Sequence, residues 1–323
     1  MDHLKFMINK SEAESICKKL GLNSVLNLLP IIAKSAQTLA RSPISNFPVA
    51  AVGLSSDGRI FIGVNVEFPG LPLHHSIHAE QFLITNMSLH PETHLKNIVV
   101  SAYPCGHCRQ FLQEIRGAPD IQILVLNTHK CDEQTLINRH RIDVETDSFT
   151  PLSQFLPHRF GPDDLLHKDV PLILETQNNN LIHDADKITQ IGNLCNGFSQ
   201  IRETELVLAA FEAANRSHAP YSGCPSGVAL VDDNGRIYTG SYMESAAYNP
   251  SMGPAQAAIV AYMAAAEGGE GGCNGGFERI SGAVLVEIEG ATVRQEETVR
   301  LFFKAVSPKC KFHVFHCQKS NCS

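Results

Sequence analysis

The sequence predicts an α/β fold, with helices packed on a mixed sheet, and predicts that this fold occurs twice along the chain. The first observation is the order of strand-like and helix-like runs between residues 49 and 126, which is β-β-α-β-α-β. The second is an internal repeat with a spacing of 177 residues, carried by these pairs: Pro43 and Pro220, Gly58 and Gly235, Gly63 and Gly240, Glu67 and Glu244. The third is length, since 323 residues, 43% of them hydrophobic, supply apolar side chains for two cores.

The chain is predicted to begin with helices. Ser11-Glu12-Ala13-Glu14 matches a capping box, which opens a short helix. A second helix is expected over Ile31–Ala40, with Pro30 near its first turn. We therefore assign residues 1–20 to a helical lead and residues 21–150 to the first copy of the fold.

Strands and helices alternate through the rest of the first copy. Asp57-Gly58 lies between two apolar runs, which is a strong signal for a β-hairpin. The expected elements are the strands Val49–Leu54 and Arg59–Val64, the helix Ala79–Leu89, the strand Asn97–Ala102, the helix Cys105–Arg116 and the strand Ile121–Leu126. The reactive residues described next then lie where strands end and helices begin, a usual place for an active site in such sheets.

Two short motifs predict a catalytic zinc site. His78-Ala79-Glu80 opens one helix, and Pro104-Cys105-Gly106-His107-Cys108 opens the next. A catalytic zinc takes three protein ligands and keeps a fourth position for water, and His78, Cys105 and Cys108 make three. A spacing of three puts both cysteine sulfurs on one side of a helix, and the helix N-terminus favours their thiolate forms.

Glu80 is the predicted acid–base residue. It lies two positions after His78 and so cannot point in the same direction, but it can reach a water on the zinc and move its proton. A structural zinc site would need a fourth ligand, for which His107 is badly placed. A redox Cys-x-x-Cys pair would leave His78 and Glu80 unexplained. The pattern therefore favours catalysis over both alternatives.

Composition narrows the class of substrate and the compartment. The net charge is −7 and no basic run is present, which favours a small substrate over nucleic acid. Ten cysteines occur without an apolar leader segment before them, and no stretch is long enough to span a bilayer. We therefore expect reduced cysteines and a cytoplasmic location, in the cytosol.

The second copy has lost its reactive residues. Residues 151–185, with several prolines and a polar run, are expected to be a connector, and residues 186–323 the second copy. With one residue lost, His78-Ala79-Glu80-Gln81 aligns with Pro254-Ala255-Gln256-Ala257, and no Cys-x-x-Cys follows the predicted strand Ile280–Ile288. Proline cannot bind zinc and glutamine cannot shuttle a proton. We predict a non-catalytic domain.

Two further patterns were weighed as ligand sites. The run Glu267-Gly268-Gly269-Glu270-Gly271-Gly272 lacks a following Lys-Ser/Thr, so a flexible connection is expected and not a phosphate cradle. The tail is rich in Cys and His: Cys310, His313, His316, Cys317 and Cys322. Its spacing fits no known zinc finger, and an edge strand is the simpler interpretation.

With these residues in view, the chain resembles the two-domain, homodimeric type of cytidine deaminase found in enteric bacteria and plants. Its paired motif is the known signature of zinc-dependent nucleobase deaminases. The resemblance covers most of the chain and includes Ser45-Asn46-Phe47, Asn65-Val66-Glu67, His78-Ala79-Glu80-Gln81, Pro104-Cys105-Gly106-His107-Cys108-Arg109-Gln110-Phe111, Phe160-Gly161-Pro162 and Pro225-Ser226-Gly227-Val228-Ala229-Leu230. It implies a duplicated three-layer α-β-α mixed sheet, with a catalytic first copy and a degenerate second copy.

The resemblance also implies a role for individual residues. His78, Cys105 and Cys108 would hold one Zn²⁺ per subunit, and Glu80 would be the proton shuttle. Substrate-binding roles follow for Asn65 and Glu67 at the sugar, Phe47 at the pyrimidine ring, the Ala79 backbone at the base carbonyl, and Phe160 in the neighbouring subunit's site. The implied reaction is attack of zinc-bound hydroxide on C4 of cytidine or 2′-deoxycytidine, with protonation of N3 and loss of ammonia. No nucleic-acid or membrane partner is implied.

Some alternatives stay open at this point. Asn65 and Glu67 could merely satisfy a turn, since the second copy keeps Glu244 although Tyr242 replaces the asparagine. Phe47 could be ordinary core. A deaminase of nucleotides or single-stranded nucleic acid shares the zinc chemistry, but a phosphate would need an Arg or Lys, and none flanks Asn65 or Glu67 in the sequence. A catalytically silent zinc-binding paralogue is the third alternative, for which Tyr103 beside the motif is the only support.

Overall fold

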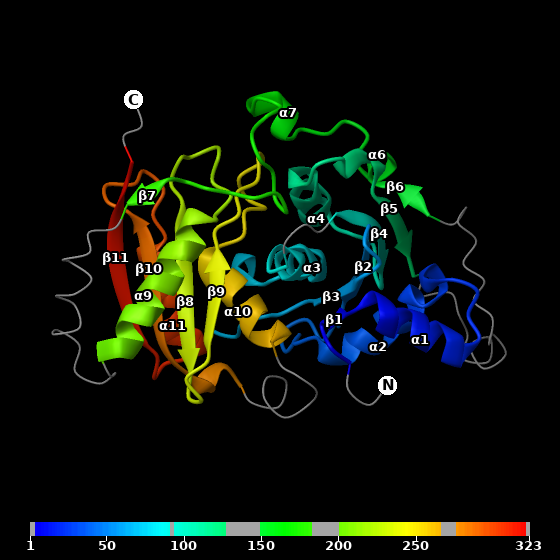
Figure 1. Cartoon of the computed structure of the whole chain (residues 1–323), viewed down its shortest axis with the longest axis horizontal. Helices are drawn as coiled ribbons and strands as arrows, with labels where there is room; N and C mark the ends of the chain where they lie inside the picture. Colours follow the sequence, from blue (N-terminus) through cyan, green and yellow to red (C-terminus); the bar gives the residue numbers. More distant parts are fainter. Residues whose placement is uncertain (1–3, 91–93, 127–148, 183–199, 266–275, 321–323) are drawn as a thin grey trace. The chain divides into compact units, whose positions relative to one another are not determined.

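The computed structural model describes residues 4–90, 94–126, 149–182, 200–265 and 276–320. Contacts divide the chain into two compact units (Figure 1). The first consists of Met1–Glu67 and Ser76–Pro162, and the second of Phe68–His75 and Asp163–Ser323. The chain therefore leaves the first unit for eight residues, between two of its predicted functional motifs, and returns to it. The two units are described separately.

The first unit contains a six-stranded mixed sheet. Its strands are β1 (Met7–Ile8), β2 (Ala50–Ser55), β3 (Ile60–Val64), β4 (Leu95–Val100), β5 (Gln122–Val125) and β6 (Thr150–Pro151). The order across the sheet is β1-β3-β2-β4-β5-β6. Only β4 and β5 run parallel, and the other neighbours are antiparallel. Gly58, at φ +87°, turns the chain between β2 and β3, as the Asp-Gly signal predicted.

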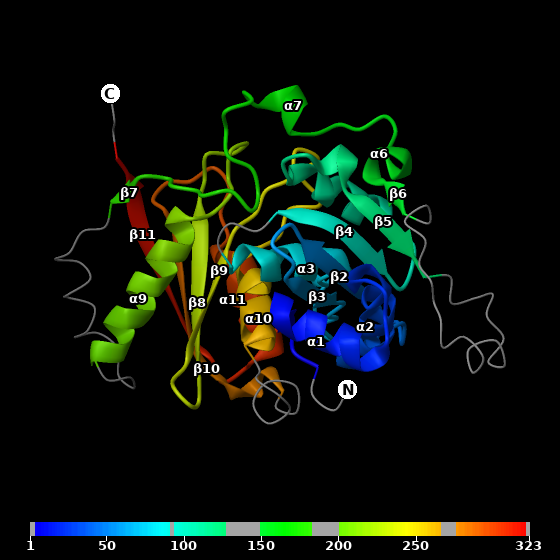
Figure 2. The same ribbon diagram turned by 45° about the vertical axis from the view of Figure 1, so that its right-hand side comes forward.

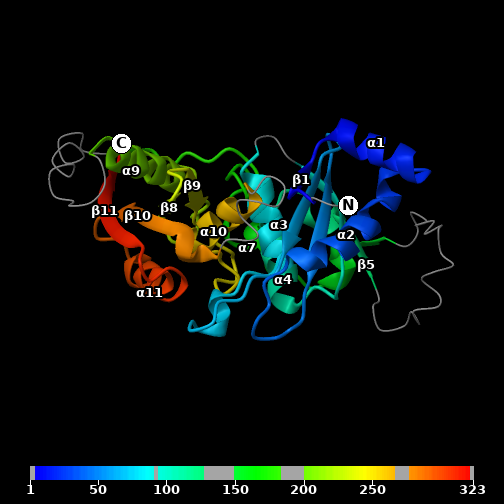
Figure 3. The same ribbon diagram turned by 90° about the horizontal axis from the view of Figure 1, so that it is seen from below.

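Helices cover both faces of this sheet. They are α1 (Lys10–Leu20), α2 (Leu29–Ala36), α3 (Ala79–Ser88), α4 (Gly106–Phe111) and the short α6 (Leu152–Phe155). Figure 3 shows α2 on one side of the strands and α3 on the other. Gly63 lets α3 lie close to β3, because a Cβ at this position would be 2.2 Å from the Ala79 carbonyl oxygen. The predicted three-layer arrangement is confirmed.

The second unit repeats this plan with five strands. They are β7 (Leu181–Ile182), β8 (Ser226–Asp232), β9 (Ile237–Ser241), β10 (Ile280–Ile288) and β11 (Lys311–Lys319), in the order β7-β11-β10-β8-β9. Its longer helices are α9 (Gln200–Asn215), α10 (Pro254–Ala264) and α11 (Glu296–Val306), and the short α7 (Pro162–Leu165) begins where the first unit ends (Figure 2). Figure 3 shows α9 and α11 on opposite sides of the strands. β10 and β11 form the one parallel pair among the described strands of this unit.

Strand register confirms the duplication residue by residue. Ala51 pairs with Gly63 in the first unit, and Val228 pairs with Gly240 in the second, so both partners are shifted by 177. Gly240 also has the same function as Gly63, since a Cβ there would lie 2.1 Å from the backbone nitrogen of Ala258 in α10. The close helix–sheet contact is thus preserved where the reactive residues are not.

Several predicted element boundaries are wrong. The helix expected from Ser11 begins at Lys10 with Asn9 at its N-cap, so Ser11 does not form the capping box. The helix expected over Ile31–Ala40 is α2, which begins at Leu29 and is followed by a 3₁₀ turn over Gln37–Leu39. The helix expected over Cys105–Arg116 is α4, which ends at Phe111 and also continues as a 3₁₀ turn. Short 3₁₀ turns of this kind are frequent at the C-terminal ends of α-helices.

Two predictions fall partly outside the described residues. The glycine run 267–272 lies in the undescribed range, as does residue 186, where the second copy was expected to begin. Residues 151–185 were expected to be a connector. Of these, the stretch to Pro162 belongs to the first unit, and the following residues belong to the second.

No single helix among the described residues has the length and apolar character needed to cross a membrane. One pair, Lys10–Leu20 followed by Val25–Leu39, meets that test of length and composition jointly, with a bend of 78° between its parts.

Candidate active site and metal centre

His78 is placed by the junction between a short bridge and α3. Val66 and Ile77 pair as an antiparallel bridge, with N···O distances of 2.9 and 2.8 Å, which fixes the backbone just before His78. His78 then occupies the N-cap of α3 in an extended conformation, and its backbone N–H donates to the Gln81 side chain at 3.3 Å. This capping contact fixes the backbone from which the imidazole projects.

The cysteines are placed in the same way at the next helix. The chain leaves β4, and Cys105 becomes the N-cap of α4 while Cys108 lies in its first turn. Cys105 is exposed and Cys108 is 1% exposed. The Nδ1 atom of His78 lies 3.5 Å from the Cys105 sulfur and 3.4 Å from the Cys108 sulfur, and the two sulfurs are 3.7 Å apart.

These distances match those required by one zinc ion. A tetrahedral zinc with Zn–S of about 2.3 Å and Zn–N of about 2.0 Å separates two sulfur ligands by about 3.8 Å, and sulfur from nitrogen by about 3.5 Å. The three donor atoms therefore already form the face of a tetrahedron with the correct edges. One imidazole and two thiolates are also the donor types that zinc prefers.

The protonation states of the cluster favour a cation. Hydrogen bonding from Cys108, and then contact with His78, lowers the pKa of the Cys105 thiol to about 3. The hydrogen bond to Cys105 and burial raise the pKa of Cys108 well above its usual value. The pKa of His78 is raised, chiefly by its bond to Cys105. The three donor atoms and the protons they share thus lie close together. A divalent cation bound among them would displace the protons, and the two thiolates would neutralise its charge.

Glu80 lies beside this cluster and is not one of its three donors. Its side chain is in the first turn of α3, is 4% exposed, and has an oxygen 3.3 Å from the Cys108 sulfur. Burial is the main cause of its raised pKa. A buried carboxyl group with a raised pKa, next to a metal position, has the properties of a residue that accepts and returns a proton.

Asn65 and Glu67 hold the loop that carries Phe47. The Asn65 amide accepts a bond from the Val49 N–H at 2.8 Å and donates to the Phe47 carbonyl at 3.0 Å. The Glu67 carboxylate accepts from the N–H groups of Ile44, at 2.8 Å, and Ser45, at 3.0 Å, and from the Ser45 hydroxyl. Burial raises the pKa of Glu67, but the bonds from Ser45 and Ile44 outweigh it, so the pKa is lowered overall.

The other predicted substrate residues lie at the surface or at the helix start. The ring of Phe47 is 48% exposed, so the alternative that it is ordinary core is wrong. Ala79 is the first residue of α3 and is 1% exposed. Tyr103 is 64% exposed and Phe160 is 45% exposed. The structure links Phe47, Asn65 and Glu67 by hydrogen bonds, and it groups Glu80 with the three metal donors.

Comparison with known proteins identifies the family. A model of the "Cytidine and deoxycytidylate deaminase zinc-binding region" matches residues 27–125, and a second model of the same description matches residues 152–300. Together these matches span more than half of the chain. The chain belongs to the cytidine and deoxycytidylate deaminase family. Zinc is the metal of this family's binding region, which confirms the metal predicted from His78, Cys105 and Cys108.

Several relatives from this deaminase family match the chain along nearly its full length. The chain is 57% identical to "Cytidine deaminase 1" of Arabidopsis thaliana over 99% of this chain and 100% of that protein. It is 44% identical to "Cytidine deaminase 6" over 98% and 99%, and 39% identical to "Probable inactive cytidine deaminase 4" over 98% and 97%. A crystal structure of cytidine deaminase from Mycobacterium tuberculosis is 26% identical, covers 43% of this chain and 99% of that one, and has a TM-score of 0.33. The two-domain architecture expected from the resemblance is confirmed.

The second deaminase-like unit bears on the alternative that Glu67 satisfies a turn. Glu244 accepts bonds from the N–H groups of Tyr221 and Ser222 and from the Ser222 hydroxyl, in the same arrangement as Glu67 with Ile44 and Ser45. The glutamate therefore stabilises this loop in both copies, as the turn interpretation expected. A role at the sugar would be an additional one: Glu67 Oε2 already accepts both backbone N–H groups, whereas Oε1 accepts the Ser45 hydroxyl and can accept a second hydrogen bond.

The second unit also shows how a deaminase site is lost. Tyr242, which replaces Asn65, is 8% exposed, and Cys224, which replaces Phe47, is 7% exposed. The Cys224 sulfur accepts a bond from the backbone N–H of Val293 at 3.5 Å. Buried side chains thus take the place of the exposed aromatic ring and the loop amide.

Two sets of contacts around Asn65 and Glu67 were missed by sequence reasoning. Ser45 binds Glu67 with both its N–H and its hydroxyl, and its recurrence as Ser222 in the repeat was the available signal. Arg41 was not considered, because it lies 24 residues before Asn65 in the sequence. The fold pairs Arg41 with Val66, and the Arg41 backbone bonds those of Asn65, at 3.0 Å, and Glu67, at 2.7 Å. The fold thus brings the Arg41 backbone next to both residues, although no basic residue flanks them in the sequence.

Among the described residues, one other group has metal-ligand chemistry: Glu287, Glu296 and His316. Glu287 accepts a bond from the Gln295 N–H at 2.8 Å and lies 3.6 Å from the His316 ring nitrogen. Glu296 pairs with Arg300 at 2.7 Å. Because these groups have protein partners, we assign no metal to them. Of the Cys-rich tail, Cys317 lies in β11, Cys310 lies just before it, and Cys322 lies outside the described residues.

Proposed function

We propose that this protein deaminates cytidine and 2′-deoxycytidine by hydrolysis, giving uridine or 2′-deoxyuridine and ammonia. The observation that carries the proposal is the buried Glu80 carboxyl group, 3.3 Å from a ligand sulfur of a three-donor zinc site. The identity of 57% with "Cytidine deaminase 1" over the full length supports the choice of substrate. The expected role is pyrimidine salvage.

In this proposal three residues bind the metal, and Glu80 transfers protons between the nucleophile and the base. A zinc ion held by His78, Cys105 and Cys108 would lower the pKa of a bound water and so supply a nucleophile at neutral pH. Glu80 accepts the proton released by the nucleophile and delivers it to N3 of the cytosine ring. The hydroxyl group now on C4 then gives up its proton, which Glu80 passes to the amino group. The C4–N bond breaks, ammonia leaves, and the oxygen on C4 becomes the carbonyl of the product.

The loop residues would hold the nucleoside. Phe47 presents an exposed ring suited to packing against a pyrimidine, and Asn65 and Glu67 fix the backbone from which that ring projects. We infer that Asn65 and Glu67 also bind the sugar hydroxyls, and that the Ala79 N–H binds the base carbonyl. The acidic net charge of −7 favours a neutral nucleoside over a polynucleotide.

The first prediction concerns turnover. Purified protein with one zinc per chain is expected to remove the ultraviolet absorption band of cytidine and of 2′-deoxycytidine, and to act at least about tenfold less well on cytidine monophosphate, whose phosphate dianion faces an acidic chain. The comparison of nucleoside with monophosphate tests whether Arg41, whose backbone pairs with those of Asn65 and Glu67, serves a phosphate group. Full zinc occupancy without turnover of any pyrimidine nucleoside would identify a silent paralogue.

We further propose a cytosolic homodimer, with no nucleic-acid or membrane partner, in which Phe160 enters the active site of the partner subunit. The support is the ring of Phe160, which is 45% exposed although its backbone is anchored to α4 through the Gln110 side chain. An exposed large aromatic side chain on a held segment is typical of an interface residue.

The second prediction tests this shared site. Glu80→Gln and Phe160→Ala chains, each poorly active alone, are expected to regain activity when unfolded and refolded together. In the mixed dimer, the site with an intact Glu80 receives Phe160 from the other chain. If Phe160 acts within its own subunit, neither site of the mixed dimer is complete and activity stays low. Light scattering gives the oligomeric state of each sample.

A further inference from the structure

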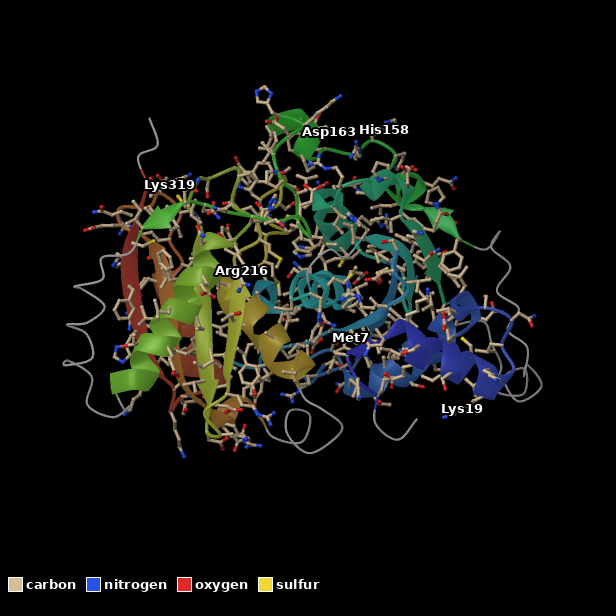
Figure 4. The ribbon with its side chains drawn as sticks, viewed as in Figure 1. Met7, Lys19, His158, Asp163, Arg216 and Lys319 are labelled. Atoms are coloured by element: carbon tan, nitrogen blue, oxygen red, sulfur yellow. The ribbon has the colours of Figure 1, made fainter. Side chains whose placement is uncertain are left out.

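The segment that carries Phe160 is held by side chains of the helix that carries the cysteines. After α6, residues 156–161 form neither helix nor strand, and His158 marks this segment in Figure 4. Side chains of α4 and of the turn that follows contact it and the end of α6. Arg109 Nη1 donates to the Phe155 carbonyl at 3.2 Å, Gln110 Nε2 donates to the Phe160 carbonyl, and Arg159 donates to Gln113 Oε1 at 3.5 Å.

The ring of Phe160 differs from other phenylalanine rings of this unit. Phe61, Phe82 and Phe111 are completely buried, and packing fixes them. Phe160 is 45% exposed, so packing fixes its side chain only in part. The position of the ring then depends on how firmly its backbone is held.

We propose that Gln110 is a positioning residue for the deaminase reaction: its bond to the Phe160 carbonyl sets the direction in which this ring enters the active site of a second copy. The inference rests on the proposed function and the shared site. It gives α4 two functions, since the first turn holds the zinc of its own subunit and Gln110, two residues after Cys108, serves the substrate of the partner.

The hydrogen bond from Gln110 to the Phe160 carbonyl can be removed by a substitution that leaves the size of the side chain unchanged. The amide of Gln110 is the donor and the carbonyl can only accept, so an isosteric carboxylate at this position cannot make the bond and repels the carbonyl oxygen. Gln110→Glu is therefore the sharpest variant. Gln110→Leu removes the donor without adding charge and shows whether the lost donor or the new charge is the cause.

The third prediction is kinetic. Gln110→Glu and Gln110→Leu are expected to raise KM for cytidine by about tenfold, the loss expected when an aromatic ring no longer stacks on a base, with a smaller change in kcat. In a Phe160→Ala background the same changes should have no further effect, because both act through one ring. Gln122→Glu is the matched control, since Gln122 also donates to a backbone carbonyl, that of Asp120, at 2.8 Å. An additive effect of Gln110→Glu and Phe160→Ala would overturn the inference.

Mixed dimers distinguish a role of Gln110 in positioning Phe160 for the partner subunit from a role in supporting the zinc site of its own subunit. Refolding Gln110→Glu with Glu80→Gln chains is expected to restore the wild-type KM, because the intact Glu80 site then receives Phe160 from a chain with an intact Gln110. If Phe160→Ala is restored by Glu80→Gln but Gln110→Glu is not, the shared site stands and the Gln110 inference is overturned. If neither is restored, the shared site is refuted and the inference falls with it. Zinc analysis of each variant confirms that the metal centre is intact.

Discussion

Replacing Glu80 with glutamine is expected to lower kcat for cytidine by about a thousandfold or more. The amide has the same shape as the carboxyl group but cannot accept the proton of the nucleophile or return it to the base. Because the carboxyl group is buried and lies beside the Cys108 sulfur, no solvent group replaces it. Steady-state rates followed by ultraviolet absorbance give the loss.

Zinc content distinguishes a lost proton shuttle from a lost metal. The Glu80→Gln protein is expected to keep one zinc per chain, because the three donors are His78, Cys105 and Cys108. Glu114→Gln is the matched control, since Glu114 is a buried carboxyl group of the same unit that is not one of the three metal donors, and its kcat should stay near the wild-type value. Substantial deamination by the Glu80→Gln protein would show that another group moves the proton.

Replacing Cys108 with alanine is expected to abolish both zinc binding and activity. Two donors remain, and a catalytic zinc needs three protein ligands. The variant also loses the stability that the metal provides, which is ~2.7 kcal/mol when free zinc is one hundred times its Kd. Metal analysis, turnover and denaturant unfolding, each with and without added zinc, measure the three effects.

A second buried cysteine provides the control for Cys108. Cys17, in α1 of the same unit, is 7% exposed and lies outside the metal cluster. Cys17→Ala should keep its zinc and its turnover, and added zinc should stabilise it as it stabilises the wild type. Retention of a full zinc equivalent by Cys108→Ala would show that the metal is held by other residues.

The zinc site could be predicted from the sequence because its geometry is largely local. Cys105 and Cys108 lie within one helical turn, and His78 and Glu80 lie within another. The duplication could also be predicted, because the glycines that allow close helix–sheet contact, Gly63 and Gly240, recur at a fixed spacing. The element boundaries were less accurate, since α2 and α4 each continue as a short 3₁₀ turn, which the pattern of apolar residues does not distinguish from an α-helix.

By itself the sequence determined the types of the metal donors, their placement at helix starts, the class of fold and its degenerate second copy. These features depend on spacings of a few residues or on one repeat. The tertiary structure alone decided that Arg41 pairs with Val66, that Glu67 binds the loop at Ser45, and that Gln110 reaches Phe160 fifty residues away. Hydrogen bonds between distant residues form only once the backbone has closed around them, so their partners are a property of the complete fold and not of any local run of residues.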